Sequence, residues 1–184
     1  MYITSSFKGV SPVKATFLIY GVIKMYKIND YVVYKKEVCK IVDIKNNYIK
    51  DNDYYTLIPL SDETLKIDIP VLNNTIRDLI SKEKLEKIIL SIPNIDIIES
   101  DDKLLENEYK KLLSSEKHED LIKIIKTTYL RNKNRLDNNK RISDKDNFYF
   151  EKAEKLLYTE FSIVLNMSYE DTKEYVLNSV KALV

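Results

Sequence analysis

The side chains that could perform catalytic chemistry are few in this chain. It has one cysteine, Cys39, and one histidine, His118, and these two form the only conceivable nucleophile–base pair. Cys39 falls within a predicted strand, whereas His118 falls at the start of a predicted helix in another part of the chain. A nucleophile needs its base within hydrogen-bonding distance, so we do not expect the two to act together. A single cysteine also cannot form an internal disulfide, which indicates a reducing compartment such as the cytoplasm.

The sequence also lacks the usual phosphate and metal motifs. Its two glycines, Gly9 and Gly21, lie near the N-terminus, whereas phosphate-binding loops need glycine for backbone amides to close on a phosphate. The run 51–53 (Asp-Asn-Asp) begins like a calcium loop but lacks the glycine and the closing glutamate. The acidic pairs at 101–102 and 119–120 fall at predicted helix N-termini, where the helix dipole favours acids. We therefore expect no enzyme activity, no cofactor and no metal site.

The net charge conceals a local basic segment. Over 184 residues, 44% are hydrophobic and 32% are charged, which is typical of a globular protein, and the net charge is only +1. Between positions 123 and 141, seven cations face one acid, a net of +6, while 143–174 carries −4. The cations are Lys123, Lys126, Arg131, Lys133, Arg135, Lys140 and Arg141. Such a segment could bind DNA phosphates with a strong salt dependence; alternatively, it is a solvated surface that balances the acidic helix after it.

Residues 1–24 do not fit the pattern of the rest. The apolar run at 15–23 has nine residues, whereas a membrane span needs about 20, and no small-residue cleavage site follows it. We expect no membrane association. We also expect translation to begin at Met25, or, if residues 1–24 are present, that they are poorly ordered.

Residues 28–70 alternate between apolar and polar side chains, as strands do. Strands are expected at 30–35, 38–44, 54–60 and 65–69. Turns are expected at 46–47, 51–53 and 61–62, where Asn, Asp and Ser supply the turn chemistry. Short strands joined by short turns indicate a small β-barrel of the Tudor or SH3 type.

From Ile76 onward the apolar period becomes helical. Helices are expected at 81–92, 103–113, 118–132, 143–165 and 168–180. Serines 81, 143 and 168 can cap three of them, and Pro93 ends the first. The sequence therefore predicts an α+β protein, with a small β-barrel domain at 25–72 followed by an all-helical domain at 76–184.

Five collinear motifs, spread from Met25 to about Leu177, resemble the CarD-like family of bacterial transcription regulators. The first spans 26–44 and is similar to the family's opening aromatic-x-x-G-D-x-V-V-Y-P pattern. The residues in matching places there are Asp30, Val32, Val33 and Tyr34. The other motifs are Tyr54-Tyr55-x-Leu57, Leu65-x-Ile67-x-Ile69-Pro70, Ile76-Arg77, and Arg141-Ile142-Ser143-x5-Tyr149-x3-Ala153-x2-Leu156-Leu157-x2-Glu160. No single motif is specific, but the collinear set is.

This resemblance implies a Tudor-like domain, shared with transcription-repair coupling factors, that binds the β subunit of RNA polymerase. It also implies a helical domain that contacts upstream promoter DNA and stabilises the open complex. The segment 123–141 would then lie toward DNA phosphates. The residues that would face polymerase are Lys45, Asn47, Tyr55, Lys66 and Asp68. Asn47 and Asp68 stand where the family has arginine.

The chain departs from the family in two places. Well-studied members wedge a tryptophan into the minor groove, but this chain has no tryptophan. Leu104 and Leu105 fall in the corresponding region, where helical spacing predicts that they belong to the core. The glycine of the family's first turn is replaced near 37–39. An alternative function therefore stays open, namely a protein–protein adaptor that keeps polymerase docking without DNA contact. Either protein would be a monomer.

Overall fold

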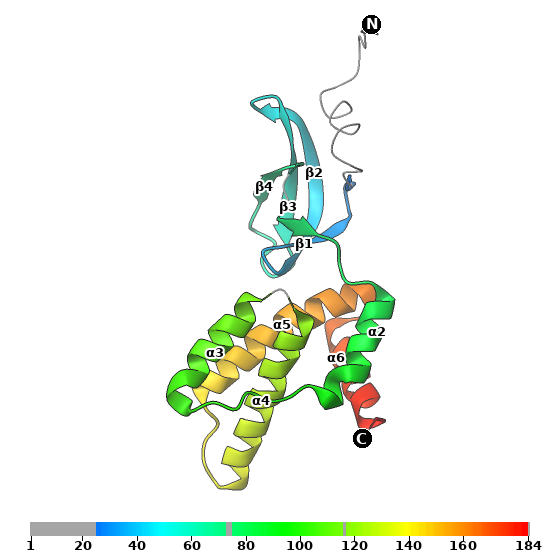
Figure 1. Ribbon diagram of the computed structural model, residues 1–184. Helices are drawn as coiled ribbons and strands as arrows, with labels where there is room; N and C mark the ends of the chain where they lie inside the picture. The colour runs from blue at the N-terminus through cyan, green and yellow to red at the C-terminus, as the bar shows by residue number, and fades with distance from the viewer. Residues whose placement is uncertain (1–24, 73–74, 116, 184) are drawn as a thin grey trace, which may run out of the picture.

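The computed structural model describes residues 25–72, 75–115 and 117–183, so the expectation for residues 1–24 lies outside the described part (Figure 1). A β-sheet occupies one end of the molecule and a group of helices the other. This mixed architecture confirms the predicted α+β class and the order of a β region followed by a helical region. No helix among the described residues is long and apolar enough to span a membrane.

Five antiparallel strands form one sheet in the described part of the chain. They are β1 (Tyr31–Tyr34), β2 (Glu37–Ile49), β3 (Asn52–Pro59), β4 (Ile67–Pro70) and β5 (Ile76–Arg77). Their order is β4-β3-β2-β1-β5, which leaves β4 and β5 at opposite edges. A closed barrel would need these two edges to pair. The sheet is therefore open, and the expected closure into a Tudor-like barrel is not confirmed.

Two details of the sheet differ from the prediction. The pair Ile76–Arg77, expected to begin the helical region, instead forms β5 against β1, because a two-residue strand is too short to show a period. The turn expected at 46–47 is absent, and the chain turns instead at Lys50 and Asp51, both with positive φ, which overlaps the turn expected at 51–53. Strand β2 continues through Asn47 because the register shifts there against β3 and Asn47 itself takes a φ of 51°.

Alternating side chains of the sheet form its own core on one face. The buried members are Val32, Cys39, Ile41, Tyr55, Leu57, Ile69 and Val71. Tyr55 is fully buried, and its hydroxyl oxygen accepts a hydrogen bond from the backbone N–H of Tyr26 at 3.0 Å. This core explains the period-2 pattern in the sequence, since successive residues of a strand point to opposite faces.

In the part of the chain that the structure describes, five α-helices follow, with one short 3₁₀ turn. They are α2 (Lys82–Ser91), η1 (Ile92–Asn94), α3 (Asp102–Ser114), α4 (His118–Asp137), α5 (Asp144–Leu165) and α6 (Tyr169–Lys181). Ser81, Ser143 and Ser168 are the N-caps of α2, α5 and α6, as predicted. Helix α4 runs five residues beyond its predicted end, because its last residues are mostly polar and show no apolar period.

Helices α4 and α5 lie at the centre of the helical region. One core cluster joins them to α2 and α6 through residues such as Ile88, Ile122, Phe161 and Val176. A second cluster joins them to α3 through Leu105, Tyr109, Ile124, Tyr149 and Ala153. The sheet meets this region near the β1–β2 hairpin, where Val33 and Val38 are buried beside Leu156 of α5. The face of the sheet opposite its core therefore packs on the helices at this end.

Candidate functional site

A hydrogen-bonded network of three side chains lies on the outer face of the sheet. Lys45 on β2 forms an ion pair with Asp68 on β4, with 2.7 Å between Nζ and Oδ2. Between them, Thr56 on β3 donates its hydroxyl hydrogen to the other oxygen of Asp68 at 2.6 Å. These hydrogen bonds from Lys45 and Thr56 lower the pKa of Asp68. Asp68 therefore stays ionised and ties three strands together across this face.

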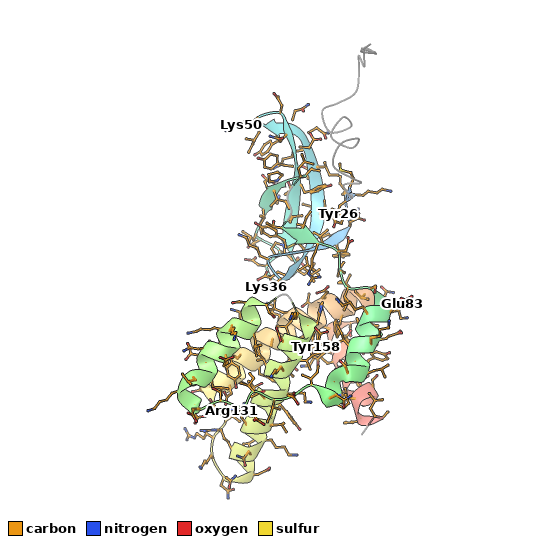
Figure 2. All side chains as sticks on the ribbon, viewed as in Figure 1. Tyr26, Lys36, Lys50, Glu83, Arg131 and Tyr158 are labelled. Atoms are coloured by element: carbon orange, nitrogen blue, oxygen red, sulfur yellow. The ribbon has the colours of Figure 1, made fainter. Side chains whose placement is uncertain are left out.

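Two tyrosines extend this surface toward the β2–β3 hairpin. The rings of Tyr48 and Tyr54 meet edge to face with 5.7 Å between their centroids, and Lys45 Nζ lies 4.5 Å from the centroid of Tyr48. Tyr48 is 50% exposed. The hairpin tip, marked by Lys50 in Figure 2, lies at the end of the sheet remote from the helices. We call the surface formed by Lys45, Tyr48, Tyr54, Thr56 and Asp68 the outer patch.

The five residues that the resemblance assigned to polymerase do not form one cluster. Lys45 and Asp68 meet in the outer patch, and Lys66 is exposed just before β4. Asn47 is exposed, and its backbone N–H donates to Asp53 at 2.9 Å. Tyr55 is buried in the sheet core, because strand alternation points it away from Tyr54.

Three members of the outer patch were missed by sequence reasoning. Thr56 and Tyr54 could have been placed beside Asp68 and Lys45 once the register of β3 was known. Tyr48 could not, because it lies between the turns predicted at 46–47 and 51–53, where no strand was expected. The missing information in each case is the register between neighbouring strands, which depends on where the turns and the register shifts fall.

Strand β4 provides a free backbone edge beside the outer patch. It pairs with β3 on one side and, among the described residues, has no strand on its other side. An edge strand presents N–H and C=O groups that a second chain can pair with. Asp68 belongs to this strand, so the outer patch and the open edge adjoin.

Strand β4 and the outer patch can therefore bind an extended segment in two ways. The edge offers backbone hydrogen bonds, and the patch offers aromatic rings with one cation and one carboxylate for side-chain recognition.

The basic segment is divided between structural and exposed cations. Lys126 donates from Nζ to the backbone oxygens of Ile92 at 2.9 Å, of Pro93 at 3.2 Å and of Ile95. It therefore caps the carboxyl end of α2 and η1, where helix carbonyls lack partners. Arg135 donates from Nε to the backbone oxygen of Arg141 at 2.7 Å, which fastens the loop after α4.

Arg131 belongs to an acid–base network that includes one buried carboxylate. Its Nε lies 3.1 Å from Oδ2 of the fully buried Asp146, and its Nη2 lies 2.6 Å from Oδ1 of Asp102. Tyr109 donates its hydroxyl hydrogen to Oδ1 of Asp146 at 3.1 Å. Arg131 thus compensates a buried charge and joins α3, α4 and α5. Of the seven predicted DNA-facing cations, only Arg131 forms an ion pair within the described residues, and Lys126 and Arg135 donate to backbone oxygens. The side chains of the other four do neither there: Lys123, Lys133, Lys140 and Arg141.

A second buried network joins the sheet to the helices at Glu160 of α5. Arg77 on β5 contacts both carboxylate oxygens, at 2.8 and 3.0 Å, and His118 Nε2 lies 2.9 Å from Oε2. The backbone N–H of Ile80 donates to Oε1 at 2.8 Å. Burial alone would raise the pKa of Glu160, but the hydrogen bonds from His118 and Arg77 outweigh it and lower the pKa to about 2. Glu160 is therefore an ionised acid in the interior.

The structure places Cys39 and His118 in different surroundings. Cys39 lies in the sheet core, where burial raises the pKa of its thiol to about 11, whereas His118 contacts Glu160 and Phe161. The described residues contain no group of three acidic, histidine or cysteine side chains that could hold a metal ion. The features suited to binding are therefore the outer patch with the β4 edge, and the exposed part of the basic segment.

Comparison with known proteins does not add a family to these features. No protein-family model matches the chain, and a search of curated proteins found no match either.

Proposed function

We propose that the protein is a CarD-like bacterial transcription regulator that acts in the cytoplasm as a monomer. It binds the β subunit of RNA polymerase through the outer patch and the edge of β4. The observation that carries the proposal is that these two features adjoin at the end of the molecule away from the helices. A partner can reach them while the helical region stays free for a second contact.

Strand addition at β4 would supply the affinity of this contact. A strand of the polymerase β subunit would pair with the free backbone groups of β4. Lys45 and Asp68 would select the partner, because both side chains are 30% exposed and can exchange their mutual pairing for charges on it. Tyr48 adds an exposed aromatic ring, a residue type enriched at interfaces.

Two motifs of the resemblance meet in space, which supports the proposal. Arg77 belongs to the hydrophobic–arginine pair, which forms β5 at the edge of the sheet, and Glu160 ends the motif of the long helix. They are 83 residues apart and form a two-pronged ion pair. A regulator that bridges polymerase and DNA needs its two regions held together. The ion pair between Arg77 and Glu160 connects the sheet to the helical region. We extend the proposal to the fold and regard the open sheet as Tudor-like, with the bulges of β2 supplying the bend.

DNA contact would come from the exposed cations and from Leu104. Lys133, Lys140 and Arg141 are exposed on and after the end of α4. Leu104, expected in the core, is 57% exposed near the start of α3, whereas Leu105 is fully buried. An exposed apolar side chain can insert between base pairs in the minor groove, so Leu104 is the candidate for that contact.

A second candidate function is an adaptor that binds polymerase without DNA. The observation that favours it is the internal use of Lys126, Arg131 and Arg135, which removes three of seven cations from the basic segment. In addition, Leu104 follows two exposed acids, of which Asp102 is paired with Arg131 and Asp101 would repel phosphates.

Polymerase docking is tested by pull-down with purified bacterial RNA polymerase. Asp68→Arg places two like charges beside each other at Lys45 and should weaken binding by at least about tenfold, since each 1.4 kcal/mol changes affinity tenfold. Glu86→Arg on α2 is the matched control, because Glu86 is also an exposed acid but belongs to the helical region and not to the outer patch. Circular dichroism checks that both variants are folded. Equal binding by Asp68→Arg and wild type would refute docking through the outer patch.

The lifetime of the promoter open complex separates the regulator from the adaptor. If the protein binds polymerase and changes this lifetime, the regulator is supported. Binding without any change in lifetime selects the adaptor, and a failure to bind polymerase at all refutes both functions.

A further inference from the structure

A cavity of about 320 Å³ lies between the β1–β2 hairpin and the helices. Lys35 and Lys36 line it from the hairpin, and Figure 2 shows Lys36 at the end of the sheet that faces the helices. Its other polar side chains belong to Thr75, Arg77, Ser115, His118 and Glu160. Its apolar wall is formed by Val33, Ile76, Leu121 and Leu156. The volume lies at the lower end of the range of small-molecule sites, about 300–1,000 Å³.

The conformation of the hairpin is unfavourable for the residues that occupy it. Tyr34 pairs with Glu37, so Lys35 and Lys36 form a two-residue turn, and their φ angles are 46° and 76°. Turns with two positive φ angles favour Asn-Gly, because a Cβ atom is disfavoured there. The chain places asparagine at four other positive-φ positions. Lys35 and Lys36 therefore occupy positions that asparagine and glycine would close at lower energetic cost.

The charge in the cavity is positive. Glu160 is the acidic residue among the described lining residues, and Arg77 and His118 already compensate its carboxylate. Lys35 and Lys36 make no ion pair with any described residue, and the ammonium of Lys35 lies 5.2 Å from the ring centroid of Tyr34. Two unpaired ammonium groups at the mouth of a small cavity attract a compact anion.

We propose that this cavity binds the phosphate group of a small molecule. Lys35 and Lys36 hold the phosphate as point charges, and the hydroxyl of Ser115 provides a further hydrogen-bond donor. The apolar wall formed by Leu121 and Leu156 covers an organic part of the ligand. The site lies at the opposite end of the sheet from the β2–β3 hairpin tip and does not depend on polymerase docking.

The test is isothermal titration calorimetry of the full chain at constant ionic strength, with phenyl phosphate, inorganic phosphate and phenol as probes. We expect saturable binding of the two phosphates and none of phenol. Tighter binding of phenyl phosphate would identify an organic phosphate as the ligand, whereas equal binding would identify free phosphate.

The decisive variant is Lys35→Asn with Lys36→Gly, which removes both cations and installs the residues that the turn prefers. It should lose at least about tenfold in phosphate affinity, since each charge-assisted hydrogen bond contributes a comparable factor, while its Tm rises. The matched control is Lys50→Asn with Asp51→Gly, because the β2–β3 hairpin is also a two-residue turn with two positive φ angles. It should bind phosphate as wild type does.

Three results would overturn the site. The first is the absence of saturable phosphate binding by the wild-type chain. The second is unchanged affinity in the Lys35–Lys36 double variant, since its raised Tm would show that it is folded. The third is binding of a short DNA duplex that depends on these lysines while phenyl phosphate does not bind, which would assign them to the DNA backbone.

Discussion

A single carboxylate, Glu160, fixes the relation between the sheet and the helices. It accepts hydrogen bonds from Arg77 on β5, from His118 at the start of α4 and from the backbone of Ile80. A buried ionised group is costly unless all its oxygens are compensated, and Glu160 has partners for both. These contacts of Glu160 explain why the sheet and the helical region stay together although each has its own core.

The stability of the protein should depend on pH through Glu160. Its pKa is about 2 in the folded chain and 4.5 ordinarily. Because the folded pKa is the lower one, the stabilisation is complete above about pH 4.5 and is lost as pH falls toward 2. The two values correspond to about 3 kcal/mol. Urea unfolding between pH 7 and pH 3 measures the first part of this loss, about 2 kcal/mol.

The variant Glu160→Gln should remove that part of the pH dependence and be less stable at pH 7, because it removes the buried carboxylate that accepts hydrogen bonds from Arg77 and His118. Glu106→Gln is the control, since Glu106 forms an exposed pair with Lys110 on α3, and such pairs contribute less than about 1 kcal/mol. If Glu160→Gln and wild type lost stability in parallel between pH 5 and pH 3, Glu160 would not be the responsible group.

Arg131 should be a structural residue rather than a DNA contact. Arg131→Met leaves the buried carboxylate of Asp146 without its cation, and we expect a loss of about 3 kcal/mol in the free energy of unfolding. Lys133→Met removes an exposed cation two residues later and should change the free energy by less than about 0.5 kcal/mol. Chemical denaturation measures the free energy of unfolding of both variants. Equal losses would contradict the assignment of Arg131 as a structural cation and of Lys133 as an exposed one.

At the scale of elements, helix starts are encoded locally. Ser143 accepts a hydrogen bond from the backbone N–H of Asp146 at 3.2 Å, and Ser143→Ala should cost about 1 kcal/mol of stability because an N–H of α5 loses its partner. Ser114→Ala at the end of α3 is the control, since Ser114 caps no N-terminus, and its effect should be below about 0.5 kcal/mol. Thermal unfolding compares the two; a larger loss in Ser114→Ala would argue against the cap.

The same elements show where local patterns fail. The caps at Ser81, Ser143 and Ser168 and the alternation in the first strands were visible in the sequence because each is set by neighbouring residues. The short strand β5 was not, since its pairing with β1 joins residues more than 40 positions apart. The extension of α4 was also missed, because a solvent-facing helix end carries no apolar period.

At the scale of the whole molecule, the exposed cations predict how DNA binding would respond to salt. Lys133→Glu combined with Lys140→Glu should lower the slope of log affinity against log salt by about 2, since each phosphate contact contributes roughly one. Lys82→Glu with Lys84→Glu on α2 is the control with equal charge change, and its slope should stay as in wild type. Fluorescence anisotropy with a promoter duplex measures the slope, and an unchanged slope in the first variant would favour the adaptor.

The sequence by itself determined the class of the fold, the order of its two regions, most strand and helix positions and three helix caps. These depend on the period of apolar residues and on hydrogen bonds between residues a few positions apart. Only the tertiary structure decided that the sheet is open, that Tyr55 is buried and Leu104 exposed, and that Lys126, Arg131 and Arg135 serve the fold. It also decided that Lys45 meets Asp68 and that Arg77 meets Glu160. Partners that lie 23 and 83 residues apart are chosen by packing, which no local spacing encodes.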